Sequence, residues 1–147
     1  MNNIQKILII DSDYQFREAL LFSLKNKLPQ MLILEYSSIN KFLKEDICVD
    51  DIQYIITDFY TVQGNVLDLL EYLDNKKFKN NIIIYTQHTL EGDNLQFKYF
   101  RLKIHIINKF DYSSLIKVLG IENVNDLKME IIEKDKIDKD FNTLSDN

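Results

Sequence analysis

Five side chains able to take part in chemistry stand at the ends of short apolar runs. Asp11 and Asp13 follow the run ILII, Asp58 follows YIIT, Thr86 follows IIIY and Lys109 follows IHIIN. Carboxylates are the oxygen ligands that Mg²⁺ prefers, and a carboxylate can also act as the nucleophile that forms an aspartyl phosphate. A hydroxyl and an ammonium can bind phosphoryl oxygens. The set therefore suits phosphoryl transfer, provided that the fold brings its members together.

Each of these residues also has an ordinary structural interpretation. Asp11 and Asp13 could cap the helix that follows them, Asp58 could be a turn residue, Thr86 a strand residue and Lys109 a solvated charge. Their recurrence at the ends of four separate apolar runs favours a shared site over five independent structural roles.

The apolar runs predict the elements that must position this site. Each is four residues long, aliphatic or β-branched, and does not alternate with polar residues, which is typical of strands buried on both faces of a parallel sheet. The runs are residues 7–10, 31–34, 54–57, 82–85 and 104–107.

Helical patterns follow each run. In the first, Phe16, Leu20, Leu24 and Leu28 recur every four residues, and Ala19 is expected on the same face. Asp13 and Ser38 are predicted N-caps, and Gly120 a helix stop. The predicted helical segments are 14–28, 37–46, 66–75, 89–102 and 111–120.

This alternation predicts an α/β fold: a five-stranded parallel sheet, doubly wound, of the flavodoxin-like (βα)5 kind. In such sheets sites form beyond the carboxyl ends of the strands. We expect one domain over residues 1–120, followed by an amphipathic segment and polar tail over residues 121–147. The tail is too short to form a further domain, so we expect either a stand-alone domain or a piece of a longer protein.

Composition narrows the class of protein. The 147 residues carry a net charge of -5 and show no basic stripe, which argues against nucleic acid as a partner. The short apolar runs predict no membrane span, and the first residues lack the apolar core of a signal peptide. One cysteine, Cys48, cannot form an internal disulfide. We therefore expect a cytoplasmic protein.

Over about residues 4–119 the chain resembles the receiver domain of response regulators, the chemotaxis-Y-like domain of bacterial two-component signalling. ILIIDSD is similar to the acidic end of the family's first strand, and YIITDF followed by VLDLL to its phospho-acceptor strand and next helix. IIIYTQH is similar to the strand that ends in the family's Thr or Ser, and IINKFD to the strand that ends in its lysine.

The resemblance implies a phosphorelay role. Asp58 would accept a phosphoryl group from a histidine kinase, Thr86 and Lys109 would engage the phosphoryl oxygens, and Asp11 with the backbone carbonyl of Tyr60 would hold Mg²⁺ together with Asp58. The domain would signal through a changed partner or homodimer surface. It would not be an enzyme beyond its own phosphorylation and dephosphorylation.

The chain departs from the family pattern at several positions. Ser12 stands where the family has a second acid that binds the metal directly, so Ser12 or Asp13 is the further candidate ligand. Val62 and Phe110 replace prolines, and Ile106 replaces a switch aromatic.

Two alternatives remain open. The first is a pseudo-receiver that keeps the fold and binds partners without phosphorylation. The second, more remote, is a phosphatase of the haloacid dehalogenase type, since IIDSD is also similar to that family's first motif, with Asp11 as nucleophile and Asp13 as acid/base.

Overall fold

The computed structural model describes residues 4–86, 95–96, 98–109 and 111–120. The chain divides into two units, residues 1–111 and 112–147, and each is described by itself. The strands of the first unit are β1 (Lys6–Ile10), β2 (Leu32–Tyr36), β3 (Ile52–Asp58), β4 (Asn81–Thr86) and β5 (Lys103–Asn108). Its helices are α1 (Tyr14–Lys27), α2 (Ile39–Glu45) and α3 (Val66–Asn75). In the second unit the described residues form α5 (Tyr112–Leu119), which ends at Gly120 with a φ of 65°, as predicted.

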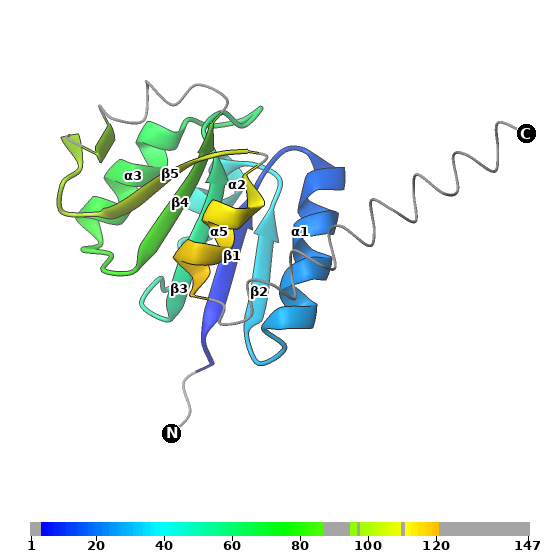
Figure 1. The fold of residues 1–147 in the computed structure, drawn as a ribbon. Coiled ribbons are helices and arrows are strands. Elements are labelled where there is room, and N and C mark those ends of the chain that lie inside the picture. The colour runs from blue at the N-terminus through cyan, green and yellow to red at the C-terminus, as the bar shows by residue number, and fades with distance from the viewer. Residues whose placement is uncertain (1–3, 87–94, 97, 110, 121–147) are drawn as a thin grey trace, which may run out of the picture. The chain divides into compact units, whose positions relative to one another are not determined.

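The five strands form one parallel sheet in the order β2-β1-β3-β4-β5 (Figure 1). Each pairing keeps a nearly continuous register, for example from Ile55 opposite Ile82 to Asp58 opposite Tyr85 between β3 and β4. All five strands predicted from the apolar runs are present, and the predicted parallel α/β architecture is confirmed.

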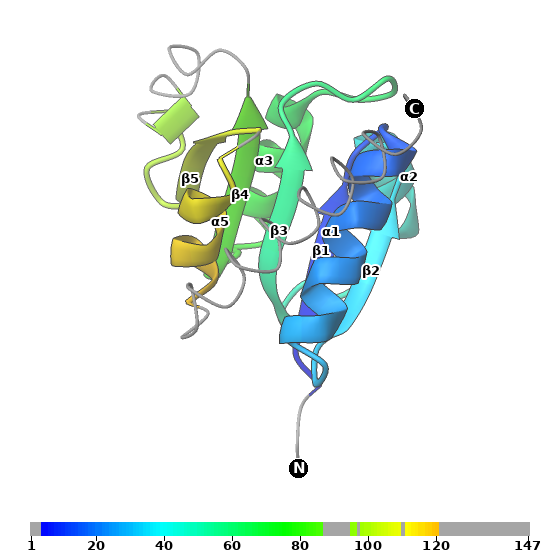
Figure 2. The ribbon, with the colours of Figure 1, turned by 45° about the vertical axis from the view of Figure 1, so that its right-hand side comes forward.

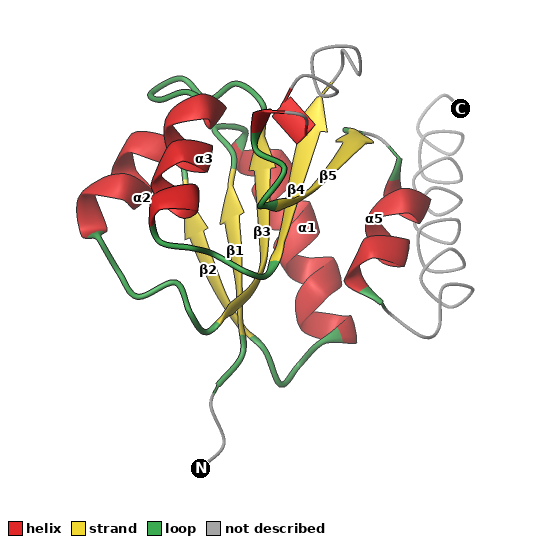
Figure 3. Ribbon diagram, turned by 90° about the vertical axis from the view of Figure 1, so that its left-hand side faces the viewer, coloured by secondary structure: helices red, strands yellow, loops and turns green. Residues whose placement is uncertain are grey.

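Helices cover both faces of the sheet. α1 runs beside β2 (Figure 2), and α2 and α3 lie together on the opposite face (Figure 3). None of the described helices is long and apolar enough to cross a membrane.

The main core lies between the sheet and α2 and α3. α3 presents the predicted stripe of Val66, Leu69, Leu70 and Leu73, and each of these side chains is fully buried. The stripe packs against alternate residues of the strands, such as Leu8, because successive strand side chains point to opposite faces.

The start of α1 confirms its predicted cap. The Asp13 carboxylate accepts a hydrogen bond from the backbone N–H of Phe16. Leu20 and Leu24 are buried as expected, but Ala19 is exposed. The prediction for Ala19 was wrong because the buried stripe of α1 is narrow, and a neighbour about 100° around the helix lies outside it.

One strand differs from the burial that its sequence predicted. β2 is an edge strand whose residues are exposed or half-buried, and 47% of Leu32 is exposed. A run of apolar residues does not distinguish a central strand from an edge strand, since that depends on pairing with distant segments. The predicted helix over 89–102 lies largely outside the described residues, although Leu95, Gln96 and Lys98 are helical.

Candidate functional site

The carboxyl ends of β1, β3 and β5 carry three of the predicted site residues. Asp11 follows β1, Asp58 ends β3, and Lys109 follows β5. β2 and β3 lie on opposite sides of β1, so the winding direction of the sheet reverses there. Such a reversal leaves a crevice at the carboxyl ends of the flanking strands. The topology therefore places Asp11 and Asp58 side by side, as the sequence predicted.

Lys109 lies between the two carboxylates. Its Nζ donates a hydrogen bond of 3.0 Å to Asp58 Oδ2 and lies 3.4 Å from Asp11 Oδ2. The exposed fractions of the three side chains are small: 14% for Lys109, 20% for Asp58 and 2% for Asp11. The ammonium therefore offsets two negative charges in a site largely withdrawn from water.

Backbone groups fix Asp11 in place. Its Oδ1 accepts a 2.8 Å hydrogen bond from the N–H of Asp13, and its carbonyl accepts one from the Arg17 guanidinium. Its Oδ2 is buried and accepts no hydrogen bond from the described residues, so its contact with Lys109 is an ion pair. Asp11 Oδ2 is therefore a buried carboxylate oxygen whose charge is met by Lys109 alone among the described cations.

Burial and the charge of the ion-pair partner shift the pKa in opposite directions, both for Asp11 and for Lys109. Burial raises the pKa of Asp11 above its ordinary value, against the lowering effects of the Asp13 N–H and the Lys109 charge. Burial by itself lowers the pKa of Lys109, but the hydrogen bond to Asp58 and the charges of both aspartates outweigh it and leave that pKa raised. Lys109 is therefore firmly cationic.

An aromatic wall, formed by Phe16 and Tyr85, stands beside the lysine. The Lys109 Nζ lies 4.9 Å from the centroid of the Phe16 ring, and the Phe16 ring meets Tyr85 edge-on at 5.3 Å. The sequence predicted Phe16 only as part of the apolar stripe of α1. Its position in the first turn, three residues after the cap, is the signal that could have placed it at the sheet edge.

The loop after Asp58 is tied to the start of α2. The Thr61 hydroxyl bonds to the carbonyls of Gln63 and Gly64, and the N–H of Asn40 donates to the carbonyl of Gln63. Gly64 has a φ of 108°, and a Cβ there would lie 2.7 Å from Asn40 Oδ1 and 2.9 Å from Ile39 Cβ. Only glycine fits this approach. The loop is thus held by the hydrogen bonds of Thr61 and by the close packing of Gly64.

Two apolar side chains of the same loop face solvent. Tyr60 is 63% exposed and Val62 is 85% exposed, and Tyr14 at the start of α1 is 64% exposed. These residues give the edge of the sheet that carries Asp58 an apolar rim.

The carboxylate oxygens at the carboxyl edge of the sheet suit a divalent cation that keeps most of its water ligands. Two carboxylates, of Asp11 and Asp58, converge there, and Mg²⁺ is usually held by one or two carboxylates together with waters. Ser12 and Asp13 are exposed, and Asp13 caps α1. The described residues contain no cluster of three His, Cys, Asp or Glu side chains that could hold a metal ion. The predicted roles of the Tyr60 carbonyl and of Ser12 or Asp13 as ligands stay predictions.

Other residues singled out in the sequence have simpler surroundings. Thr86 ends β4, but its side chain and Phe110 lie outside the described residues. Ile106 packs against the core, and the ring of His105 forms a 3.0 Å hydrogen bond with Asn81 of the neighbouring strand.

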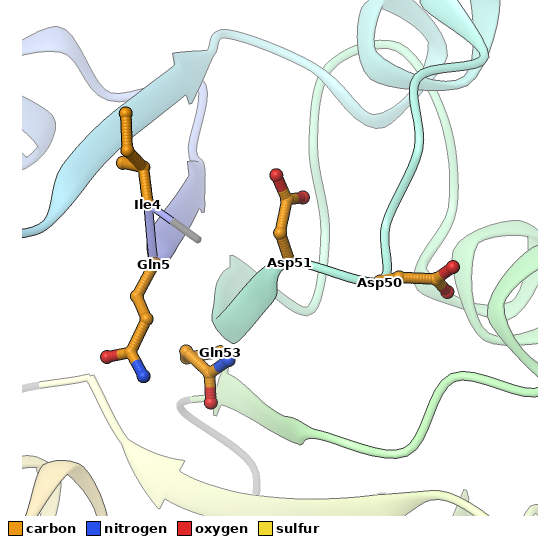
Figure 4. Close-up of a pocket in the computed structure, with 5 residues that line it drawn as sticks. All are labelled: Ile4, Gln5, Asp50, Asp51 and Gln53. Atoms are coloured by element: carbon orange, nitrogen blue, oxygen red, sulfur yellow. The ribbon is translucent and has the colours of Figure 1, made fainter. Parts of the chain in front are cut away.

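A hollow of about 280 Å³ lies at the opposite, amino-terminal edge of the sheet. It is lined by Ile4, Gln5, Asp50, Asp51 and Gln53, and Figure 4 shows the Asp50 side chain pointing away from the two glutamines. Lys6 pairs with Asp51 at 2.7 Å. None of the predicted site residues lines this hollow.

Solved structures share this architecture at low sequence identity. Response regulator TrrA from Thermotoga maritima, in complex with Mg²⁺-BeF, has a TM-score of 0.65 and 18% identity, covering 80% of this chain and 97% of its own. Chemotaxis protein CheY4 from Vibrio cholerae has a TM-score of 0.63 and 16% identity, with the same coverages of 80% and 97%. This chain has the receiver-domain fold.

The likeness concerns the receiver fold alone. A chain titled adenylate cyclase, from Rhodopirellula baltica, matches at a TM-score of 0.56 and 16% identity, covering 92% of this chain and 98% of its own. No family model and no curated protein matches the sequence. The fold by itself does not decide the chemistry of the chain, which depends on the residues at its own site.

Proposed function

We propose that this receiver accepts a phosphoryl group on Asp58 from the phosphohistidine of a histidine kinase. The observation that carries the proposal is the position of Lys109, which bonds Asp58 at 3.0 Å and lies 3.4 Å from the buried Asp11. A lysine held between two carboxylates at a sheet edge is suited to neutralise a dianionic phosphoryl group.

The transfer is a displacement at phosphorus. A carboxylate oxygen of Asp58 forms a bond to phosphorus while the bond from phosphorus to the donor's imidazole nitrogen breaks, and the electron pair returns to the imidazole. Lys109 then moves its hydrogen bond from the Asp58 carboxylate to a phosphoryl oxygen. Thr86 is proposed to bind a second phosphoryl oxygen from the end of β4.

A bound Mg²⁺ would supply further positive charge beside the phosphoryl oxygens. Asp11, Asp58 and the carbonyl of Tyr60 would hold it, with water where the family has a second acid. Asp11 Oδ2 supports this proposal, because it is a buried carboxylate oxygen that accepts no hydrogen bond from the described residues.

Intact-protein mass spectrometry tests the proposal. The protein is incubated with Mg²⁺ and acetyl phosphate, a small phosphoryl donor, and compared with Asp58→Asn and with a sample in EDTA. A single phosphoryl adduct that is lost in both controls is the expected result. An adduct that persists in Asp58→Asn would exclude Asp58 as the acceptor.

A pseudo-receiver is the second candidate, favoured by Ser12. This exposed hydroxyl stands where the resemblance implies a carboxylate, which leaves two acids, both paired with Lys109. The absence of both an adduct and Mg²⁺ binding by calorimetry would support this candidate over the first.

The dehalogenase-type phosphatase has less support from the geometry. Its nucleophile would be Asp11, which is buried, and its acid/base would be Asp13, whose carboxylate caps α1. An adduct that is lost in Asp11→Asn and kept in Asp58→Asn would revive it.

We also propose a cellular setting and partners for the domain. We place it in the cytoplasm as a signalling module, with residues 1–120 as the receiver and with a histidine kinase and a second copy of the chain as partners. Phe100, which is 76% exposed while Tyr99 beside it is buried, is a candidate contact for such a dimer.

A further inference from the structure

Phe16 contacts both Lys109 and Tyr85, a residue of the neighbouring strand β4. Its ring faces Lys109 Nζ at 4.9 Å, and its edge meets the buried ring of Tyr85, which lies opposite Asp58 in the pairing of β3 and β4. No charge-based role of the site requires an aromatic residue at this position of α1.

We propose that Phe16 is a positioning residue that holds Lys109 between Asp11 and Asp58 and keeps water from a phosphoryl group on Asp58. The second half of this statement rests on the proposed function, and the first half does not. A lysine side chain is a flexible four-carbon stem. The face of an aromatic ring attracts its ammonium, and a ring fixed by Tyr85 restricts where that ammonium can lie.

The start of α1 fixes the ring in turn. The Phe16 N–H donates to the Asp13 carboxylate, and Arg17, the next residue, donates to the carbonyl of Asp11. The backbone of Phe16 is thus bonded into the same turn that holds Asp11. Because neither bond involves the Phe16 side chain, a smaller side chain at position 16 would leave space beside Lys109 rather than move the helix.

Water exclusion affects one defined step. In hydrolysis, a water oxygen forms a bond to phosphorus, the bond from phosphorus to the Asp58 oxygen breaks, and the electron pair returns to the carboxylate. The proton of the attacking water passes to the released phosphate or to solvent. A ring that covers Lys109 leaves less space for water on the α1 side of Asp58, so its removal should shorten the lifetime of the phosphoryl group.

The first test uses the unphosphorylated protein. Proton NMR on protein labelled at the lysine ε-carbon, with the Lys109 signal assigned by Lys109→Arg, reports the ring next to it. We expect an upfield ring-current shift of the Lys109 ε-methylene that is lost in Phe16→Leu and kept in Phe16→Tyr. Phe22→Leu is the matched control, since Phe22 lies on the same helix and is 64% exposed.

The second test measures the half-life of the phosphorylated protein by intact mass after acetyl phosphate is removed. We expect Phe16→Leu to shorten the half-life about three- to tenfold, and Phe16→Tyr and Phe22→Leu to leave it within about twofold. Thermal unfolding of each variant confirms that it is folded.

The outcomes separate the two ideas. An unchanged Lys109 shift in folded Phe16→Leu overturns the positioning role, and an unchanged or longer half-life overturns the water-excluding role. An equal change in Phe22→Leu overturns both, because it would reflect a general effect on α1. If the wild-type protein forms no adduct, the proposed function and the water-excluding role fail, and the NMR experiment alone decides whether Phe16 positions Lys109.

Discussion

Lys109→Met tests whether the lysine is the charge that makes this site stable. Coulomb's law with an effective dielectric constant of about 20 gives an attraction of about 5 kcal/mol for each of its two ion pairs, which span 3.0 and 3.4 Å. Withdrawing the ammonium from water offsets much of this gain. Because Lys109 is 14% and Asp58 20% exposed, we expect a net loss of about 2 kcal/mol in the free energy of unfolding near neutral pH.

The loss should depend on pH with a definite sign. Without the lysine, the pKa of Asp11, already raised by burial, rises further. A carboxyl group whose folded pKa exceeds its unfolded value contributes stability that is complete below the unfolded pKa, here 3.8, and is lost as pH rises through the folded pKa. The deficit of Lys109→Met relative to the wild type should therefore shrink as pH falls from about 7 toward about 4.

Urea denaturation followed by circular dichroism measures these differences. A loss of about 2 kcal/mol lowers the midpoint by about 1 M if the slope is unchanged. Lys103→Met, on β5 and exposed, is the matched control and should cost less than about 0.5 kcal/mol. Adding Asp58→Asn to Lys109→Met removes one of the two unbalanced acids and should recover about 1 kcal/mol.

Three results would refute this reasoning. Lys109→Met could have the same free energy of unfolding as the wild type near neutral pH. It could lose no more stability than Lys103→Met. Its loss of stability relative to the wild type could also stay constant with pH. In each case the two carboxylates would not need Lys109 as their counter-ion.

Three further predictions concern the rest of the domain. Gly64→Ala should cost about 1–3 kcal/mol in urea denaturation, since its φ is 108° and its Cβ would lie 2.7 Å from Asn40 Oδ1; a neutral result would mean that the loop moves freely. Ser12→Asp should tighten Mg²⁺ binding in calorimetry at least about tenfold by adding a third carboxylate, whereas Ser12→Asn should not; equal affinities would show that position 12 does not reach the metal. Burial and a 2.8 Å hydrogen bond to Asp46 raise the pKa of Tyr72 to about 12, so the ultraviolet titration of Tyr72→Phe should differ from the wild type only above about pH 11. A difference already present near pH 10 would contradict the hydrogen bond.

Local pattern was enough to predict most of the elements. The apolar stripe from Val66 to Leu73 predicted both ends of α3 correctly. Four apolar side chains on one face of a helix can be buried together only if that face packs against the core. Asp13 predicted the start of α1, because an N-cap side chain bonds only to the backbone N–H groups that directly follow it in the chain. The apolar runs predicted five strands, and their alternation with helices predicted a parallel sheet.

The sequence also predicted which strand ends would meet. Asp11, Asp58 and Lys109 converge because parallel strands bring their carboxyl ends to one edge, and this rule needs only the order of the elements.

Contacts between distant segments were decided only by the tertiary structure. The exposure of Leu32 depends on β2 lying at the sheet edge, and the need for Gly64 depends on the approach of Asn40 from α2. The same holds for the Phe16 ring over Lys109, which joins residues from the first and last parts of the described domain. The periodicity of α1 determines that Phe16 faces the sheet. Which group the Phe16 ring touches depends on which strand ends lie next to α1. The order of the strands in the folded sheet decides this, and local sequence does not.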